Sequence, residues 1–447
     1  MRKSHLLRIA YHFIAARWRW QTLRGEALTR YQDERAQRIT AFTNKHSPFY
    51  GAHWAGHDIR QWRDLPTVNK QTMMTNLDTF NTLRIKSDEA LAVALQAERE
   101  RNFSPTINGT TVGLSSGTSG HRGLFLISPS EQSGWAGVIL SRTLHRLRPG
   151  GEQVAFFLRS NSNLYESVDS RLIRFRYFDL MMPLKDAVIA LNDYQPSIIV
   201  GPPSLLGFLA EAKERSELRA TPERLISVAE VLEPHDQARL ESVFQVPVHQ
   251  IYQCTEGLLA VSCSAGSLHI QEDMIVMQFE PVQEAVTLTM TDNFSPTRVT
   301  PIITDLWRTT QPMIRYRLND ILQLQTTPCK CGSDFRIIKA IEGRSDDVCY
   351  FETHEGNRRP FFPDTIRRMI LLASDAIEDY QAFQDRTGQI RIHLVAADSF
   401  GAAAHAVRAS VDSTLAQYGC QADEVVIAEG LVSVPTGVKR RRVQKIG

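Results

Sequence analysis

From about residue 105 the chain alternates short apolar runs with segments of helical pattern, and this alternation limits the fold more than any other feature. Two of the helical segments begin with proline, which is favoured at the first turn of a helix. Strand and helix at this spacing predict a parallel α/β sheet. The predicted strands are Val154–Leu158, Ser197–Val200, Leu225–Ala229 and Val246–Tyr252, and the predicted helices are Pro203–Arg215 and Pro234–Phe244.

The length of 447 residues exceeds what one compact core supports and fits two or three domains. Residues 1–100 have a mostly helical pattern, and a further change falls near Gly343. We therefore expect the α/β class, with a large N-terminal domain (1–343) of several subdomains and mostly parallel sheets. A small, mobile α+β domain (344–447) follows. Its predicted elements are strands at Asp379–Phe383, Gln389–Val395 and Glu424–Ala428 and a helix at Ala402–Tyr418.

Composition excludes several classes of protein. Apolar residues make up 43% and charged residues 22% of the chain, as in soluble globular proteins. The net charge of +2 gives no electrostatic argument for nucleic-acid binding. The longest apolar run, Ser197–Ala210, contains two prolines and is too short to cross a bilayer, and no signal peptide is recognisable. Six cysteines do not make a disulfide scaffold in this length, so we expect a cytoplasmic protein.

Basic residues gather near the N-terminus among leucine, isoleucine, phenylalanine and tryptophan. Such a segment fits a helix that rests on an anionic membrane surface. A charge run is more often the solvated face of a helix, and we favour that interpretation. The basic residues are Arg2, Lys3, Arg8, Arg17, Arg19, Arg24 and Arg30.

The stretch Leu114–Gly123, LSSGTSGHRG, combines three glycines with four small hydroxylic residues. Gly113–Gly117 fits the G-x-S-x-G pattern of a hydrolase nucleophile elbow, but the residues that follow do not support the required helix. A Walker A loop needs Gly-Lys, which is absent here. Glycine amides and serine and threonine hydroxyls can also bind phosphate oxygens in other loops. On this stretch alone, a phosphate loop and an ordinary surface turn remain equally open.

Six motifs in a fixed order resemble the adenylate-forming superfamily of acyl-CoA synthetases, adenylation domains and luciferases. Details such as "CKCG" and "FFPDTI" are most similar to its phenylacetate–coenzyme A ligase branch, which includes synthetases that adenylate a deazaflavin cofactor. The likeness extends upstream to "FYGAHW" and "LPTVNKQTM" and so covers most of the chain. The six motifs are LSSGTSGHRG, VAEVL (Val228–Leu232), IYQCTEG (Ile251–Gly257), PMIRYRLNDI (Pro312–Ile321), IEGRSDDV (Ile341–Val348) and PTGVKRRRV (Pro435–Val443).

The resemblance implies an ATP site in which the glycine-rich stretch contacts the leaving phosphates. It also implies that Tyr252 stacks on adenine, that Ala229 and Glu230 frame the edge of the base, and that Asp320 accepts hydrogen bonds from the ribose hydroxyls with Arg344 nearby. Singly, each residue also fits an ordinary core, cap or turn role. The loop residues are Ser115, Ser116, Gly117, Thr118, Ser119 and Gly120.

The catalytic residues implied by the resemblance are Lys439, Thr255 and Glu256. Thr255 would donate to the α-phosphate, and Glu256 would hold Mg²⁺ as an oxygen ligand. Lys439 would stabilise the charge that develops during adenylation, although Arg440–Arg442 compete for this role. Asp346 matches the hinge about which the C-terminal domain would rotate. Lys70 fits an upstream lysine of the branch and is a candidate phosphate contact.

Two departures from the family pattern bear on function. His121 and Arg122 stand where the loop usually ends with lysine, and Arg122 supplies charge with a different geometry. After GRSDD the chain has a longer and bulkier segment, VCYFETHEGNRRPFFP, than the glycine-containing turn of the branch. This segment puts the thiol-transfer step, and coenzyme A as acceptor, in question.

Three cysteines and one histidine form a candidate zinc site. Thiolate and imidazole ligands suit structural Zn²⁺, and some members of the branch carry a similar cluster. The alternative is two unrelated cysteine turns. Cys254, Cys349 and Cys420 fit ordinary buried small residues. The candidate ligands are Cys263, His269, Cys329 and Cys331.

We therefore expect an acid–thiol ligase that activates a carboxylic acid, with aromatic acids favoured, as an acyl-AMP. The acyl group would pass to coenzyme A or to a phosphopantetheine carrier protein. Two alternatives remain: an adenylyltransferase that leaves AMP on a phenolic or cofactor acceptor, and a nucleotide-binding protein without catalysis. The expected cofactors are ATP, Mg²⁺ and structural Zn²⁺. We expect no nucleic-acid partner and no transmembrane segment, and we leave a homodimer open.

Overall fold

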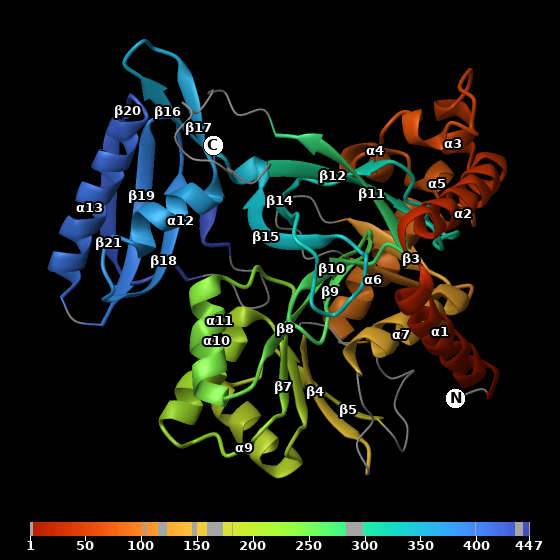
Figure 1. The fold of residues 1–447 in the computed structure, drawn as a ribbon, viewed down its shortest axis with the longest axis horizontal. Helices are drawn as coiled ribbons and strands as arrows, with labels where there is room; N and C mark the ends of the chain where they lie inside the picture. The colour runs from red at the N-terminus through yellow and green to blue at the C-terminus, as the bar shows by residue number, and fades with distance from the viewer. Residues whose placement is uncertain are drawn as a thin grey trace.

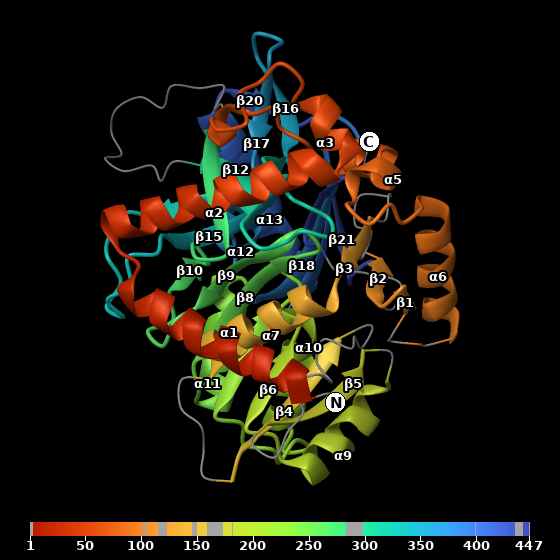
Figure 2. The same ribbon diagram turned by 90° about the vertical axis from the view of Figure 1, so that its right-hand side faces the viewer.

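The structure, a computed structural model, describes residues 3–100, 102, 105–114, 123–144, 150–158, 173–180, 182–282, 298–397, 399–433 and 441–446. The N-terminal hundred residues are helical, as predicted. Figure 2 shows α1 and α2 lying across one face of the molecule. The helices of this segment are α1 (Lys3–Thr22), α2 (Gly25–His46), α3 (Pro48–His53), α4 (Lys70–Thr75), α5 (Leu77–Phe80) and α6 (Ser87–Glu100), with the short 3-10 helix η1 (Trp62–Asp64).

A twelve-stranded sheet forms the centre of the molecule, in the order β11-β12-β14-β15-β10-β9-β8-β7-β6-β4-β5, with β13 paired to β12. Strands β4 to β8 pair in parallel. This half confirms the strands and helices predicted from the alternating pattern. Its elements are β4 (Glu152–Leu158), β5 (Ile173–Asp179), β6 (Ile198–Gly201), β7 (Arg224–Val228) and β8 (Val248–Cys254), with α7 (Pro129–Thr143), α9 (Leu184–Tyr194), α10 (Pro203–Glu214) and α11 (Pro234–Phe244).

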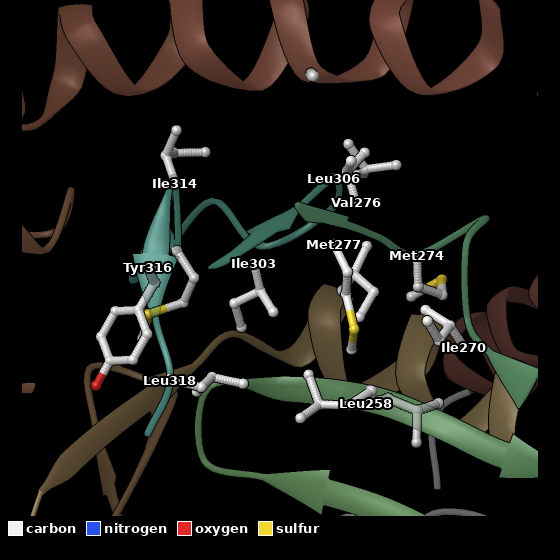
Figure 3. Packing of buried hydrophobic residues seen from close by; sticks show 14 of the residues in the cluster. Leu258, Ile270, Met274, Val276, Met277, Ile303, Leu306, Ile314, Tyr316 and Leu318 are labelled. Carbon is white, nitrogen blue, oxygen red and sulfur yellow. The ribbon is translucent and has the colours of Figure 1, made fainter. Parts of the chain in front are cut away.

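From β8 onward the sheet is antiparallel. The α/β class is confirmed, but the large sheet is mixed rather than mostly parallel, because each of these strands pairs without a helical crossover. Figure 3 shows aliphatic side chains packed within this half, with the hydroxyl of Tyr316 pointing away from them. The strands are β9 (Gly257–Ser262), β10 (Leu268–Ile270), β11 (Ile275–Pro281), β12 (Arg298–Asp305), β13 (Tyr316–Arg317), β14 (Asp320–Gln325) and β15 (Ile337–Arg344).

Two smaller groups of strands complete the fold. A three-stranded sheet, β1 (Thr106–Ile107), β2 (Thr110–Leu114) and β3 (Leu124–Ile127), packs against α6. After the 3-10 helix η2 (Ser345–Asp347) the chain builds its own buried cluster, which lies apart from the large sheet in Figure 1. The domain boundary near Gly343 stays a prediction. The C-terminal elements are β16 (Cys349–Thr353), β17 (Arg358–Phe361), α12 (Pro363–Leu371), β18 (Ile377–Gln384), β19 (Gln389–Ala396), α13 (Phe400–Gln417), β20 (Cys420–Gln421), β21 (Glu424–Glu429) and β22 (Val443–Lys445).

Helices cover both faces of the parallel strands, with α9, α10 and α11 on one face and α1 and α7 on the other (Figure 1). Alternate residues of β4 explain this arrangement, because Val154 and Phe156 pack towards α7 whereas Ala155 and Phe157 pack towards α10. Helix α1 lies close against α7 at Gly137. A Cβ atom added there would come within 2.6 Å of the Ile9 carbonyl oxygen and 2.5 Å of the His12 Cβ.

A buried ion cluster also fixes α1. Arg19 of α1 contacts one carboxylate oxygen of Asp273 at 2.8 Å, and Arg142 of α7 contacts the other at 2.9 Å. The Asp273 side chain is fully buried, so these two guanidinium groups replace the water that its charge would otherwise require.

We predict that Gly137→Ala lowers the free energy of unfolding by about 1–3 kcal/mol, since the new methyl group must displace the backbone of α1. Gly134→Ala on the same helix is the matched control, because its Cβ would meet only His12 ring atoms at 3.6 Å or more. Chemical unfolding followed by circular dichroism compares the two. Equal stability of the two variants would contradict this account of the α1–α7 contact.

Candidate functional site

A cavity of about 190 Å³ lies at the carboxyl ends of the parallel strands. In open α/β sheets, ligands bind at this end of the strands. Five of the residues predicted from the motifs line this one cavity, although they come from four separate segments of the chain. They are Ala229, Glu230, Tyr252, Asp320 and Arg344.

The residues after β7 leave the strand in an unusual conformation. Ala229 has a φ of 70°, in the left-handed region that residues with a side chain rarely adopt. The amide of Glu230 then donates to the carbonyl oxygen of Val228 at 2.9 Å. The sharp turn directs the chain across the cavity, and such strained positions are common at binding sites.

Tyr252 connects the two halves of the sheet. Its hydroxyl donates to the Asp320 carboxylate at 2.5 Å, and the Arg344 guanidinium lies 3.9 Å from the other carboxylate oxygen. Burial, followed by the charge of Asp320, raises the pKa of Tyr252 well above its usual value. Tyr252 therefore keeps its proton, and the hydrogen bond holds its ring at the edge of the cavity.

Glu256 lies in the turn between β8 and β9, and hydrogen bonds fix both of its carboxylate oxygens. Thr255 Oγ1 donates to Oε2 at 2.9 Å, and the Tyr316 hydroxyl donates to Oε1 at 3.0 Å. Burial lowers the pKa of Lys70, and the charge of Glu256 partly offsets this effect, which indicates that the two side chains are near each other. A single oriented carboxylate fits Mg²⁺, which usually binds one or two protein carboxylates together with substrate phosphates and water.

Tyr316 is the residue of this group that the sequence interpretation left without a role. Tyr316 lies in the motif PMIRYRLNDI, and with Arg317 it forms the short strand β13. No signal in the sequence marks it, because its role follows from the hydrogen bond to Glu256, which is 60 residues away in the chain.

Asp346 and Asp347 lie in η2, between the last strand of the large sheet and the C-terminal elements. Asp346 is exposed, and its carboxylate accepts a hydrogen bond from Asn319 at 2.5 Å. Its neighbour Asp347 is buried and pairs with Arg441 through two contacts of 3.0 Å. The Gly343 backbone has a φ of 125° and lies against Pro363, so a side chain at this position would be strained.

Arg442 holds the C-terminal segment against the large sheet's helix α11. Its guanidinium lies 2.5 Å from Asp236 and 3.7 Å from Glu233 of the α11 N-terminus, and 3.1 Å from Asp379 of β18. Burial raises the pKa of Glu233, and the charge of Arg442 opposes this effect. Three carboxylates from two parts of the chain therefore share one cation.

Two predicted groups cannot be compared with the structure. Ser115–Gly120, between β2 and β3, and Lys439 lie outside the described residues. Their roles stay predictions.

The four predicted metal ligands meet in space, although Cys263 and Cys329 are far apart in the sequence. Their ligand atoms all lie within 4.8 Å of one another. The Cys263 and Cys329 sulfur atoms are 3.6 Å apart, and the Cys331 sulfur lies 3.4 Å from His269 Nε2. His269 Nδ1 is 2.7 Å from the Phe335 carbonyl oxygen, which leaves Nε2 available as a ligand.

These separations fit a tetrahedral metal site. With metal–sulfur and metal–nitrogen bonds of about 2.3 and 2.1 Å, neighbouring ligand atoms would lie roughly 3.5–3.8 Å apart. A disulfide would require about 2.05 Å between sulfurs, so the cysteines are not paired covalently. The prediction that these four residues form one cluster is confirmed.

No protein-family profile matches the sequence, and no curated protein matches it. Solved structures do match. The 2-hydroxyisobutyryl-CoA ligase in its postadenylation state, in complex with an acyl-AMP, has a TM-score of 0.70 at 17% identity, over 96% of this chain and 91% of that one. The same ligase in its thioesterification state with coenzyme A has a TM-score of 0.57 at 19% identity, over 96% and 91%.

A further match is an anthranilate CoA ligase in complex with anthranoyl-AMP, with a TM-score of 0.50 at 11% identity, over 73% of this chain and 65% of that one. The resemblance inferred from the motifs is thus confirmed at the level of the fold, while the phenylacetate–coenzyme A ligase branch stays a prediction.

We predict that Arg442→Gln weakens the attachment of the C-terminal segment by up to about 3 kcal/mol, because three carboxylates then lose their main cation. Arg386→Gln is the matched control, since Arg386 lies 3.8 Å from one exposed carboxylate and is 68% exposed. Limited proteolysis and chemical unfolding provide the readouts. If both variants behave like the wild type, Arg442 does not hold this contact.

The chain has the fold of the acyl-CoA ligases that have been solved with acyl adenylates.

Proposed function

We propose that the protein activates a carboxylic acid with ATP and transfers the acyl group to a thiol. In the first step a carboxylate oxygen attacks the α-phosphorus, the bond to the bridging oxygen breaks, and pyrophosphate leaves. The observation that carries this proposal is the cavity that Tyr252 and Asp320 share at one end of the sheet, with Glu256 four residues after Tyr252, in a chain with this fold.

In this proposal, different residues of the cavity bind different parts of ATP. The Tyr252 ring would stack on adenine, with Ala229 and Glu230 at the edge of the base. Asp320 already accepts one hydrogen bond from Tyr252, and its remaining acceptor positions suit the ribose hydroxyls. Arg344 would contribute positive charge on the same side of the cavity.

The reaction centre would lie around Thr255 and Glu256. Thr255 would donate to the α-phosphate, and Glu256 would hold Mg²⁺, which neutralises phosphate charge when bound. Lys70, whose pKa the charge of Glu256 raises against the effect of burial, would contact phosphate. The loop Ser115–Gly120 would bind the leaving pyrophosphate and Lys439 the attacking carboxylate, with Asp346 as the hinge for a second arrangement that admits the thiol.

A second candidate function is transfer of AMP itself to a phenolic or cofactor acceptor. The observation that favours it is the hairpin of β16 and β17, whose pairing extends from Cys349 to Phe361 after GRSDD. A hairpin of this length occupies the position where the branch has a short turn. The mass of the product separates the two functions, because AMP is released in the first and retained in the second.

We predict ATP–pyrophosphate exchange that depends on an added acid, in a panel of aromatic acids and short aliphatic acids. Glu256→Gln is expected to lower the exchange rate roughly 100-fold or more, since the oriented charge is lost while the shape is kept. Glu424→Gln, at an exposed position of β21, is the control. Absence of exchange with every acid in the wild type would exclude ligation, and ATP binding without turnover would favour a non-catalytic protein.

We also propose that Cys263, His269, Cys329 and Cys331 bind structural Zn²⁺, and predict about one zinc per chain by elemental analysis. Cys329→Ser is expected to lower the zinc content and the thermal stability together, since metal binding contributes to folding. Cys254→Ser, a partly buried cysteine outside the cluster, is the control and should keep its zinc. Full zinc content in Cys329→Ser would contradict the assignment.

A further inference from the structure

The outward face of α1 is apolar, although the sequence favoured a solvated basic face. Four large apolar side chains point to solvent there: Leu7 is 70% exposed, Tyr11 66%, Ile14 67% and Trp18 61%. Their spacing of four, three and four residues places them in one stripe along the helix. Contiguous exposed apolar surface of this kind marks an interaction site on a protein.

The helix cannot hide this stripe by rotating. Its opposite face carries Ile9 and Ala16, which are buried against α7 and the large sheet. Arg19 is fixed by the buried ion pair with Asp273, and Gly137 allows the close approach of α7. The stripe is therefore a fixed feature of the surface.

The charged side chains of α1 itself are all basic. Residues Lys3–Thr22 contain no aspartate or glutamate. Arg8 is exposed beside the stripe, and Arg24 is exposed just beyond the end of the helix. A second copy of this helix would bring like charges together, whereas an anionic surface would be attracted.

We propose that the outward face of α1 binds an anionic lipid surface. Tryptophan and tyrosine favour the boundary between lipid and water, where the ring is buried and its polar group stays hydrated. Leu7 and Ile14 would enter the acyl boundary, and the flanking arginines would contact lipid phosphates. The helix would lie in the plane of the surface. Within the part of the chain that the structure describes, no helix is both long and apolar enough to cross a bilayer.

The proposal predicts that the full chain binds vesicles of phosphatidylcholine that contain phosphatidylglycerol, and binds pure phosphatidylcholine vesicles much less. Added salt should weaken binding because it screens the arginine charges. The double variant Leu7→Gln/Ile14→Gln should lower the partition coefficient at least about tenfold, since partition depends on buried apolar area. Co-sedimentation with the vesicles measures this.

A matched control uses exposed apolar residues elsewhere on the surface. Ile189 of α9 is 60% exposed and Leu372 after α12 is 74% exposed, so Ile189→Gln/Leu372→Gln removes comparable surface. This control should bind as the wild type does, and circular dichroism should show that both double variants are folded. Equal binding by the two double variants, or no binding by the wild type at low salt, would overturn the proposal.

The alternative partner of this face is a second copy of the chain, which would change the oligomeric state. Sedimentation equilibrium of the wild type and of Leu7→Gln/Ile14→Gln distinguishes a lipid surface from a second copy of the chain. A wild-type dimer that becomes monomeric in this variant, without vesicle binding, would replace the lipid surface by a homodimer interface. A wild type that binds the vesicles and has the same oligomeric state as the variant supports the lipid proposal.

Discussion

The hydrogen bond between Tyr252 and Asp320 joins strands that are not neighbours in the sheet. Tyr252 lies near the end of β8, Asp320 begins β14, and three other strands lie between them in the sheet order. Their side chains meet only because the antiparallel half curls back towards β8. Register shifts in the β14–β15 pair accompany this curvature, as bulges do in strongly bent sheets. The cavity exists where the two halves converge, so the position of the candidate site follows from the curvature of the sheet.

The sequence predicted the parallel half well because its determinants are local. Apolar runs, prolines at the first helical turn and short connections lie within a few residues of each other, as at Pro203 and Pro234. The antiparallel half depends on pairings such as Ile275 with Asp305, which bring together residues that are distant in the sequence. No local pattern specifies these partners, so the mixed character of the sheet was not predictable.

In the candidate site, too, local sequence patterns were informative and contacts between distant residues were not predictable. The ordered motifs contain Tyr252 and Asp320, which the structure brings together. They did not single out Tyr316, which is recognisable only from its hydrogen bond to Glu256. The sequence analysis weighed α1 as a helix on a membrane surface but favoured a solvated basic face, for a related reason. Charge counts drew attention to the arginines, yet burial depends on which side of the helix meets α7, and Arg19 turned out to be among the buried residues.

The basic run near the C-terminus left four cations competing for the catalytic role, and the contacts reduce this number. Arg441 is paired with both oxygens of Asp347, and Arg442 is surrounded by Glu233, Asp236 and Asp379. A guanidinium held by carboxylates has little remaining attraction for a phosphate in this arrangement. Under the proposed reaction, Lys439 and Arg440 then remain as the candidates for this role. A lysine ammonium, as a compact charge on a flexible stem, can follow the α-phosphate as its geometry changes.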